Sequence, residues 1–232
     1  LTIRILFHCY VRKISVIESY FSRVKFAHTL FAMPFALIGF FEGWQTLDIS
    51  FPWRILFLVV LCMVFARNSA MGFNRYIDRK YDALNPRTSN RDVPAGRVSP
   101  RAALTFVIIN CILFCATTFF INKLTFFLSP VALVVVLGYS YTKRFTSLAH
   151  FVLGLSLAIA PTGAYIAVTG QFDILPVLYS IIVLLWSGGF DILYALPDEE
   201  FDKSVKLKSI PTAIGRKRAM ILSWTVHISA AI

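Results

Sequence analysis

Two clusters of acidic and amide side chains in this sequence have a spacing that suits metal or phosphate chemistry. In the first cluster, Asn74, Asp78 and Asp82 follow one another at intervals of four residues. Four residues are slightly more than one helical turn, so the three side chains are predicted to lie along one face of a helix. Carboxylates grouped in this way repel one another unless a positive charge lies between them. The spacing therefore indicates a cation-binding site.

The second cluster lies in the stretch DILYALPDEEFD, about 117 residues further along the chain. Its members, Asp191, Tyr194, Asp198 and Asp202, are separated by offsets that also place them on one helical face. Pro197 interrupts the stretch and is expected to bend the helix there. Each cluster follows a strongly apolar run and precedes a long basic loop, so the same chemistry occurs twice.

Both clusters favour Mg²⁺ over Zn²⁺ because their ligands are oxygen atoms and no paired His or Cys is nearby. Mg²⁺ usually takes one or two carboxylates and completes its shell with water and phosphate oxygens. The neighbouring Arg and Lys residues suit the outer oxygens of a diphosphate. We therefore expect Mg²⁺ as the cofactor, and the predicted metal-site residues are Asn74, Asp78, Asp82, Asp191, Asp198 and Asp202.

A simpler interpretation of the first cluster is a solvated helix end. In that case Asp78 and Asp82 would pair with Arg75, Arg79 or Lys80 on the same helix. The presence of two such clusters, each at the end of an apolar run, makes this alternative the weaker one.

Several further residues are predicted to contact substrate. Arg67 lies seven residues before Asn74, hence on the same helical face and about 10 Å deeper in the membrane. A guanidinium at that depth needs an anionic or carbonyl partner, which could be a substrate carboxylate or an acidic side chain. Lys143 and Arg144, in the stretch GYSYTKRFT, could reach a diphosphate or could simply anchor the helix at the membrane surface. The complete set of predicted substrate-binding residues is Arg67, Asn68, Arg91, Tyr139, Lys143 and Arg144.

The four histidines are scattered, and none has a spacing that predicts catalysis. His28 is the best placed of them, because it begins the first apolar run. The four cysteines lack metal-ligand spacing and are expected to be ordinary lipid- or core-facing residues.

The composition places these clusters in an integral membrane protein. The chain of 232 residues is 57% hydrophobic and only 15% charged, whereas soluble domains are about 45–50% apolar and about a quarter charged. Apolar runs long enough to span a bilayer predict six complete helices, at 26–44, 53–73, 102–121, 124–142, 148–169 and 173–195. A seventh run begins near Ala219, and its shortness leads us to expect an incomplete C-terminus. Residues 1–24 have the pattern of a helix that lies on the membrane surface, which leaves 25–232 as the membrane domain.

The basic residues predict the orientation. Of the 23 Lys and Arg residues, 20 fall in the N-terminal segment and in the 75–101, 143–147 and 196–218 connections. An excess of this kind marks the cytoplasmic side. We therefore expect a multi-pass protein of the bacterial inner membrane, with its active site facing the cytoplasm. The same bias explains the net charge of +11 without nucleic acid, and no obligate protein partner is evident.

At the two clusters, the sequence resembles the UbiA superfamily of membrane prenyltransferases. The first cluster is similar to that family's N-x-x-x-D-x-x-x-D motif, and the second to its D-x-x-Y-x-x-x-D-x-x-x-D motif. The stretches NPRTSNRDVPAGRVS and KFAHTLFAMPFAL resemble 4-hydroxybenzoate polyprenyltransferases and their menaquinone-pathway relatives. The resemblance covers roughly residues 20–232.

This resemblance implies a bundle of nine helices, of which six complete helices and part of a seventh would be present here. It also implies Mg²⁺-dependent transfer of a polyprenyl group from its diphosphate to an aromatic acid, in ubiquinone or menaquinone synthesis. Lys143, with Arg91 or Arg144, would neutralise the leaving group, and Arg67 would orient the acceptor carboxylate. Asp191 would polarise the phenol, and Tyr194 completes the predicted catalytic set.

Other functions remain open from the residues alone. Within the family, the acceptor is expected to be 4-hydroxybenzoate, with a naphthoate-type menaquinone precursor as the alternative. A CDP-alcohol phosphotransferase would require a D-G-x-x-A-R pattern, which we do not find. A cation-coupled transporter would place its acidic residues near the middle of the bilayer rather than at the helix ends.

Overall fold

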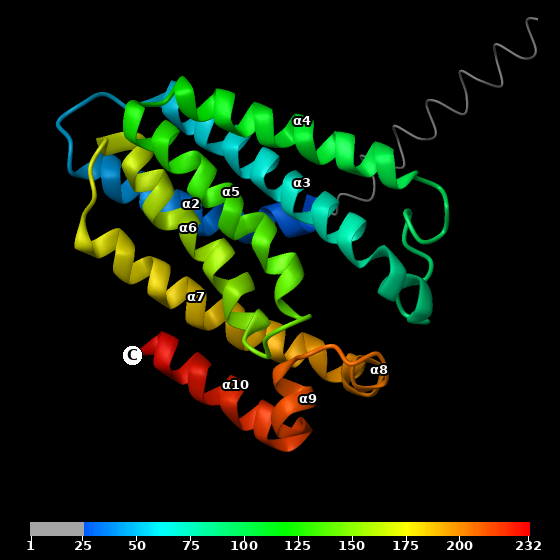
Figure 1. Ribbon diagram of the computed structural model, residues 1–232. Helices are drawn as coiled ribbons and strands as arrows, with labels where there is room; N and C mark the ends of the chain where they lie inside the picture. The colour runs from blue at the N-terminus through cyan, green and yellow to red at the C-terminus, as the bar shows by residue number, and fades with distance from the viewer. Residues whose placement is uncertain (1–25) are drawn as a thin grey trace, which may run out of the picture.

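The computed structural model describes residues 26–232, and every regular element in that range is a helix (Figure 1). The long helices are α2 (Phe26–Gln45), α3 (Trp53–Leu84), α4 (Pro100–Phe119), α5 (Lys123–Thr142), α6 (Ala149–Thr169) and α7 (Ile174–Ala195). They are followed by the 3-10 turn η1 (Leu196–Asp198), α8 (Glu199–Ser204), α9 (Ile210–Ile214) and α10 (Arg216–Ala231). The predicted all-α class is confirmed. The predicted surface segment at 1–24 lies outside the described residues.

The long helices coincide with the predicted spans to within a few residues at most ends. Five helical segments in the described part of the chain are long and apolar enough to cross a membrane: Trp53–Leu84, Pro100–Phe119, Lys123–Thr142, Ala149–Thr169 and Ile174–Ser204. The chain is therefore a multi-pass integral membrane protein. α2 occupies the first predicted span, and α10 begins three residues before the position expected for the seventh helix.

Helix α3 extends well beyond the span predicted at 53–73. Its 32 residues give a length of about 48 Å at 1.5 Å per residue, against about 30 Å for the hydrocarbon layer. The first acidic cluster thus continues the same helix past the apolar run. α3 ends where Asn85 adopts an extended conformation before Pro86, as expected because a residue that precedes proline avoids helical angles.

Polar side chains fix where the next helices begin. Ser99, Asn122 and Asp173 each accept a hydrogen bond from a backbone N–H in the first turn of α4, α5 and α7 respectively. Such caps satisfy backbone groups that a helix start leaves unpaired. Asn122 also donates to the carbonyl of Ile166 over 2.8 Å, which joins the start of α5 to the end of α6.

The helices pack closely around α6, which contacts α2, α5 and α7. On one side of the bundle α3 packs against α4, and α10 lies along α7 (Figure 1). A Cβ atom at Gly154 of α6 would come within 2.5 Å of the carbonyl oxygen of Leu184 in α7, so only glycine allows this approach. Gly189 of α7 also permits close packing, because a Cβ there would lie 2.7 Å from the His227 ring of α10.

The C-terminal ends of α3 and α5 lie at the same end of the bundle as the junction of α7 with α8 (Figure 1). The backbone N–H of Lys208 donates to the carbonyl of Lys143 over 2.7 Å, which joins the segment before α9 to the end of α5. Both acidic clusters are therefore positioned at one end of the bundle.

Candidate active site

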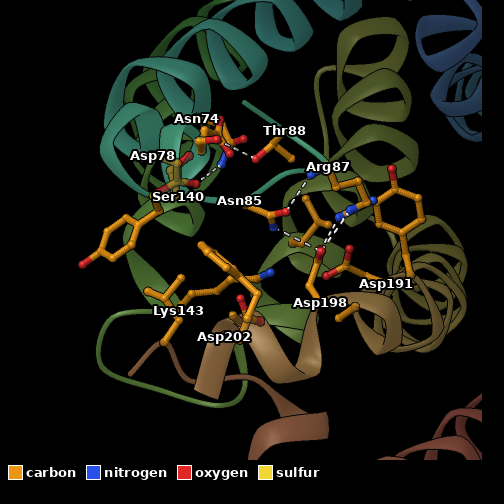
Figure 2. A pocket seen from close by; sticks show the side chains of 18 of the residues that line it. Asn74, Asp78, Asn85, Arg87, Thr88, Ser140, Lys143, Asp191, Asp198 and Asp202 are labelled. Atoms are coloured by element: carbon orange, nitrogen blue, oxygen red, sulfur yellow. Dashed lines mark hydrogen bonds and ion pairs between the residues drawn. The ribbon is translucent and has the colours of Figure 1, made fainter. Parts of the chain in front are cut away.

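A cleft of about 210 Å³ opens at this end of the bundle. Its walls come from α3 and the following loop, the end of α5, the start of α6, and α7 through α8 (Figure 2). All six residues predicted to bind metal line the cleft: Asn74, Asp78, Asp82, Asp191, Asp198 and Asp202. The two clusters, far apart in sequence, thus face one space.

On the α3 wall, each aspartate already has a charged partner from elsewhere in the chain. Asn74 donates to Asp78 over 2.8 Å, and Nη2 of Arg144 lies 3.4 Å from the other oxygen of Asp78. Nη1 of Arg91 donates to Oδ1 of Asp82 over 2.6 Å. Basic residues of two connections therefore converge on the first cluster.

The alternative of a solvated helix end receives little support from these contacts. Arg75 is the one residue of the three considered that approaches an aspartate, with 3.9 Å between its Nη1 and Oδ2 of Asp82. Arg79 donates instead to the carbonyl of Tyr76 over 2.6 Å. Within the described residues, no ion pair joins Arg79 or Lys80 to the cluster.

The opposite wall is formed where α7 ends, at the η1 turn that contains Pro197. The predicted bend at this proline is confirmed. Although η1 separates α7 from α8, Asp191, Tyr194 and Asp198 all still line the cleft, as does Asp202 on α8.

Asp198 is held by the loop that follows α3. Nε of Arg87 donates to Oδ1 of Asp198 over 2.9 Å, a second guanidinium nitrogen contacts Oδ2, and Asn85 donates over 3.3 Å (Figure 2). Partial burial lowers the pKa of Arg87, but its hydrogen bonds and its attraction to Asp198 outweigh burial and raise that pKa. The guanidinium also lies 5.2 Å from the centre of the Tyr194 ring, within the range of a cation–π contact.

Asp191 has a different partner. Its Oδ2 lies 2.7 Å from Nδ1 of His150, a fully buried residue at the start of α6. Nε2 of the same ring accepts the backbone N–H of Ile210 over 3.2 Å. The imidazole therefore bridges α7 and α9.

Of the predicted substrate-binding residues, Arg91, Tyr139, Lys143 and Arg144 line the cleft. Lys143 forms no ion pair with any acidic side chain of the described region, although it lines the same cleft as Asp202 (Figure 2). Among the basic residues that line the cleft, Lys143 is therefore the one whose side chain forms no ion pair.

Arg67 and Asn68 do not line the cleft. Asn68 donates to the side chain of Asn110 on α4 over 3.1 Å, so its amide is committed to helix packing. Nε of Arg67 is buried without a hydrogen-bond partner. The contact of Arg67 and Asn68 with substrate stays a prediction.

The carboxylate oxygens that line the cleft are the type of ligand that Mg²⁺ prefers. Oδ2 of Asp82 and Oδ2 of Asp202 are buried and accept no hydrogen bond, which is costly for a carboxylate unless a cation is supplied. Among the described residues, no three Asp, Glu, His or Cys side chains are close enough together to hold a metal ion. Mg²⁺ does not need three, because it commonly uses one or two carboxylates and completes its shell with water and phosphate oxygens.

Three residues of the site were missed by sequence reasoning: Asn85, Arg87 and His150. Asn85 and Arg87 lie in the loop NPRTSNRDVPAGRVS. The resemblance of this loop to the family could have identified both residues as part of the site. For His150 the spacing gave no signal, since its partners are 41 and 60 residues away.

Comparison with known proteins agrees with this geometry. The model of the UbiA prenyltransferase family matches residues 32–232, so the chain belongs to that family. Proteins described as 4-hydroxybenzoate octaprenyltransferase are similar to it, among them one from Aliivibrio fischeri (strain MJ11), 36% identical over 166 residues. That match covers 71% of this chain and 57% of the relative, so the chain spans somewhat more than half the length of such relatives.

Solved structures show the same fold. A UbiA homologue from Aeropyrum pernix K1, determined in its apo form, superposes with a TM-score of 0.82 at 32% identity, covering 89% of this chain and 76% of that one. A homologue from Archaeoglobus fulgidus bound to GPP and Mg²⁺ gives a TM-score of 0.71 at 23% identity, covering 88% of this chain and 71% of that one. The predicted UbiA-type bundle is confirmed.

Proposed function

We propose that this protein transfers a polyprenyl group from a polyprenyl diphosphate to an aromatic acid in quinone biosynthesis. The observation that carries the proposal is the cleft itself, where two rows of carboxylates and several cations face one another at the end of an apolar bundle. A prenyl diphosphate has the matching chemistry, since its head is highly charged and its tail is hydrocarbon.

Mg²⁺ is the proposed cofactor, held by Asp82 and Asp202 together with other carboxylates of the two clusters. When bound, the ion supplies positive charge that neutralises the diphosphate. Oδ2 of Asp82 and Oδ2 of Asp202, which are buried and accept no hydrogen bond, support this assignment.

Basic side chains are proposed to bind the outer oxygens of the diphosphate. Lys143 is available without breaking an existing ion pair, whereas Arg91 and Arg144 would have to share theirs with Asp82 and Asp78. Positive groups that are already in place where negative charge develops lower the barrier to departure of the diphosphate. The carbon–oxygen bond then breaks to leave an allylic cation.

The acceptor is proposed to react as a phenol. Asp191 would accept a hydrogen bond from the hydroxyl and so raise the electron density of the ring, and the ortho carbon would attack the allylic cation. The ring would then lose its ortho proton to the released diphosphate and become aromatic again. Arg67 would bind the carboxylate through its unpartnered guanidinium nitrogen. Exclusion of water from the apolar interior would protect the cation from hydrolysis.

The hydrocarbon tail is proposed to occupy two apolar cavities beyond the cleft. Their volumes are about 120 and 400 Å³, and their walls share several side chains, including Phe114, Ile159 and Gly163. The smaller cavity includes Val136, one helical turn from the cleft residue Ser140. The smaller cavity thus approaches the cleft to within about one helical turn along α5.

Among acceptors, 4-hydroxybenzoate is proposed first because the curated relatives described above are 4-hydroxybenzoate octaprenyltransferases. A naphthoate-type menaquinone precursor is the second candidate. The proposed location is the bacterial inner membrane, with the cleft facing the cytoplasm, as the basic loops indicate.

The test is prenyl transfer in membranes that contain the full-length protein, with Mg²⁺, a radiolabelled polyprenyl diphosphate and 4-hydroxybenzoate. Asp78→Ala and Asp198→Ala variants serve as controls and should form no product. Product with a hydroxynaphthoate alone would move the protein to menaquinone synthesis. A folded protein that prenylates no aromatic acceptor would refute the proposed function.

A further inference from the structure

His150 is fully buried, although it lies at the start of a helix. It is the second residue of α6 and is 0% exposed, yet both ring nitrogens have polar partners on other helices. One partner is Asp191 of the cleft, and the other is the backbone of Ile210, the first residue of α9. Because one rigid ring makes both contacts, the imidazole fixes the distance between the Asp191 carboxylate and the backbone N–H of Ile210.

The contact with Ile210 determines which nitrogen of the ring carries the proton. A backbone N–H can only donate, so Nε2 must accept and therefore carries no hydrogen. The ring proton is then on Nδ1, where it points at Oδ2 of Asp191 over 2.7 Å. His150 in this neutral tautomer donates to the carboxylate and accepts from the amide.

The same contact fixes the orientation of Asp191. Its side chain is 21% exposed and lines the cleft, and His150 is its one hydrogen-bond partner among the described residues. With Oδ2 engaged by the ring, Oδ1 remains for a group in the cleft. The other three cleft aspartates that have ion pairs, Asp78, Asp82 and Asp198, are paired with arginines instead.

We propose that His150 is a positioning residue, which holds Asp191 with one oxygen bound to the ring and presents the other oxygen to the acceptor. The backbone of Ile210 maintains the required tautomer. This proposal rests on the proposed function, since it assigns Asp191 to the phenol. Hydrogen bonds to a functional carboxylate or histidine commonly act in this way, and their loss costs about 10- to 100-fold in activity or affinity.

A histidine that only fills space in the core would behave differently from a positioning histidine. Glutamine offers one donor and one acceptor on a neutral group, as the imidazole does here, whereas leucine fills space and offers neither. A His150→Gln variant should therefore keep most of the wild-type rate, and His150→Leu should not.

The first measurement compares steady-state kinetics of the full-length wild type, His150→Gln, His150→Leu, Asp191→Asn and the His150→Leu/Asp191→Asn double variant. We expect His150→Leu to lower kcat for prenyl transfer by about 10- to 100-fold while KM for the prenyl diphosphate stays unchanged. The double variant should be no slower than Asp191→Asn alone, because both changes remove one interaction. Losses that multiply, or a glutamine variant as impaired as the leucine variant, would overturn the proposal.

A second measurement does not depend on turnover. In ¹⁵N-histidine NMR spectra, the His150 signal, assigned by its absence in His150→Gln, should show the proton on Nδ1. A proton on Nε2 would overturn the proposal. If the spectra show the proton on Nδ1 but the protein prenylates no acceptor, the His150–Asp191 arrangement is upheld and the proposed function is refuted. Failure of the proposal and failure of the proposed function can therefore be distinguished.

Discussion

Arg87 and Asp198 are 111 residues apart in sequence, yet the guanidinium of Arg87 binds both oxygens of the Asp198 carboxylate. A guanidinium that contacts a carboxylate through two nitrogens gives a more directional interaction than a single ion pair. This contact joins the loop after α3 to the start of α8 across the mouth of the cleft. The two motif-bearing segments are thus held together by side chains as well as by helix packing.

Replacement of Arg87 by methionine should loosen α8 without unfolding the protein. The pair is partly exposed, so its loss is expected to change the free energy of unfolding by only about 0–1 kcal/mol. Amide hydrogen exchange of residues 199–204 should nevertheless become faster. Arg97→Met is the matched control, because Arg97 pairs with Asp92 inside its own loop. Equal exchange rates in the two variants would show that Arg87 does not hold α8.

Asp82 and Asp202 each have one buried oxygen that accepts no hydrogen bond, and replacement of either residue should weaken Mg²⁺ binding at the cleft. For Asp82→Asn and Asp202→Asn, we expect the Mg²⁺ concentration that gives half-maximal activity to rise by at least about tenfold, since even partners of metal ligands contribute that much. Asp92→Asn is the control, because Asp92 does not line the cleft. Titration of activity with MgCl₂ provides the measurement, and unchanged midpoints in both variants would count against Mg²⁺ at these residues.

Lys143→Gln should weaken binding of the prenyl diphosphate. A hydrogen bond to a charged group contributes about 1.5–3 kcal/mol, which corresponds to an increase of about 10- to 100-fold in KM for this substrate. KM for the aromatic acceptor should not change. Lys123→Gln, at the opposite end of α5, removes the same charge outside the cleft and should have no effect. If both variants raise KM equally, the cause is the overall charge of the protein rather than a contact in the cleft.

Gly154→Ala should destabilise the protein, because the new Cβ would lie 2.5 Å from the carbonyl oxygen of Leu184 and 3.1 Å from the backbone nitrogen of Gly188. Backbone atoms cannot turn aside, so α6 and α7 would have to separate, at a cost of about 1–3 kcal/mol. Gly163→Ala in the same helix is the control. Its Cβ would meet Ile159 at 3.9 Å, an ordinary contact, and helix propensity favours alanine by about 0.5–1 kcal/mol. Thermal unfolding in detergent compares the two, and equal midpoints would contradict the packing argument.

Much of the fold could be predicted because hydropathy alone determines which segments lie in a membrane. The ends of helices were less predictable. Apolar character ends at residue 73, whereas α3 continues to Leu84, since backbone hydrogen bonds extend a helix into water as long as the sequence allows. The residue that stops it, Asn85 before Pro86, carries a local signal that hydropathy does not measure.

The site could be predicted where spacing within one helix determines a shared face. Asn74, Asp78 and Asp82 follow that rule, and all line the cleft. Asn68 shows the limit of such reasoning, because its amide turns to Asn110 on a neighbouring helix. The partnership of His150 with Asp191 depends on which helices pack together, and no spacing within either helix contains that information.

The two walls of the cleft differ in the continuity of their helices. One wall is the last turns of α3, a single uninterrupted rod, whereas the other is divided by the η1 turn at Pro197, whose missing N–H leaves the helix without a hydrogen bond there. Bending is concentrated where a helix is broken. Any change in the distance between the two rows of carboxylates is therefore expected to occur at the η1 turn rather than along α3.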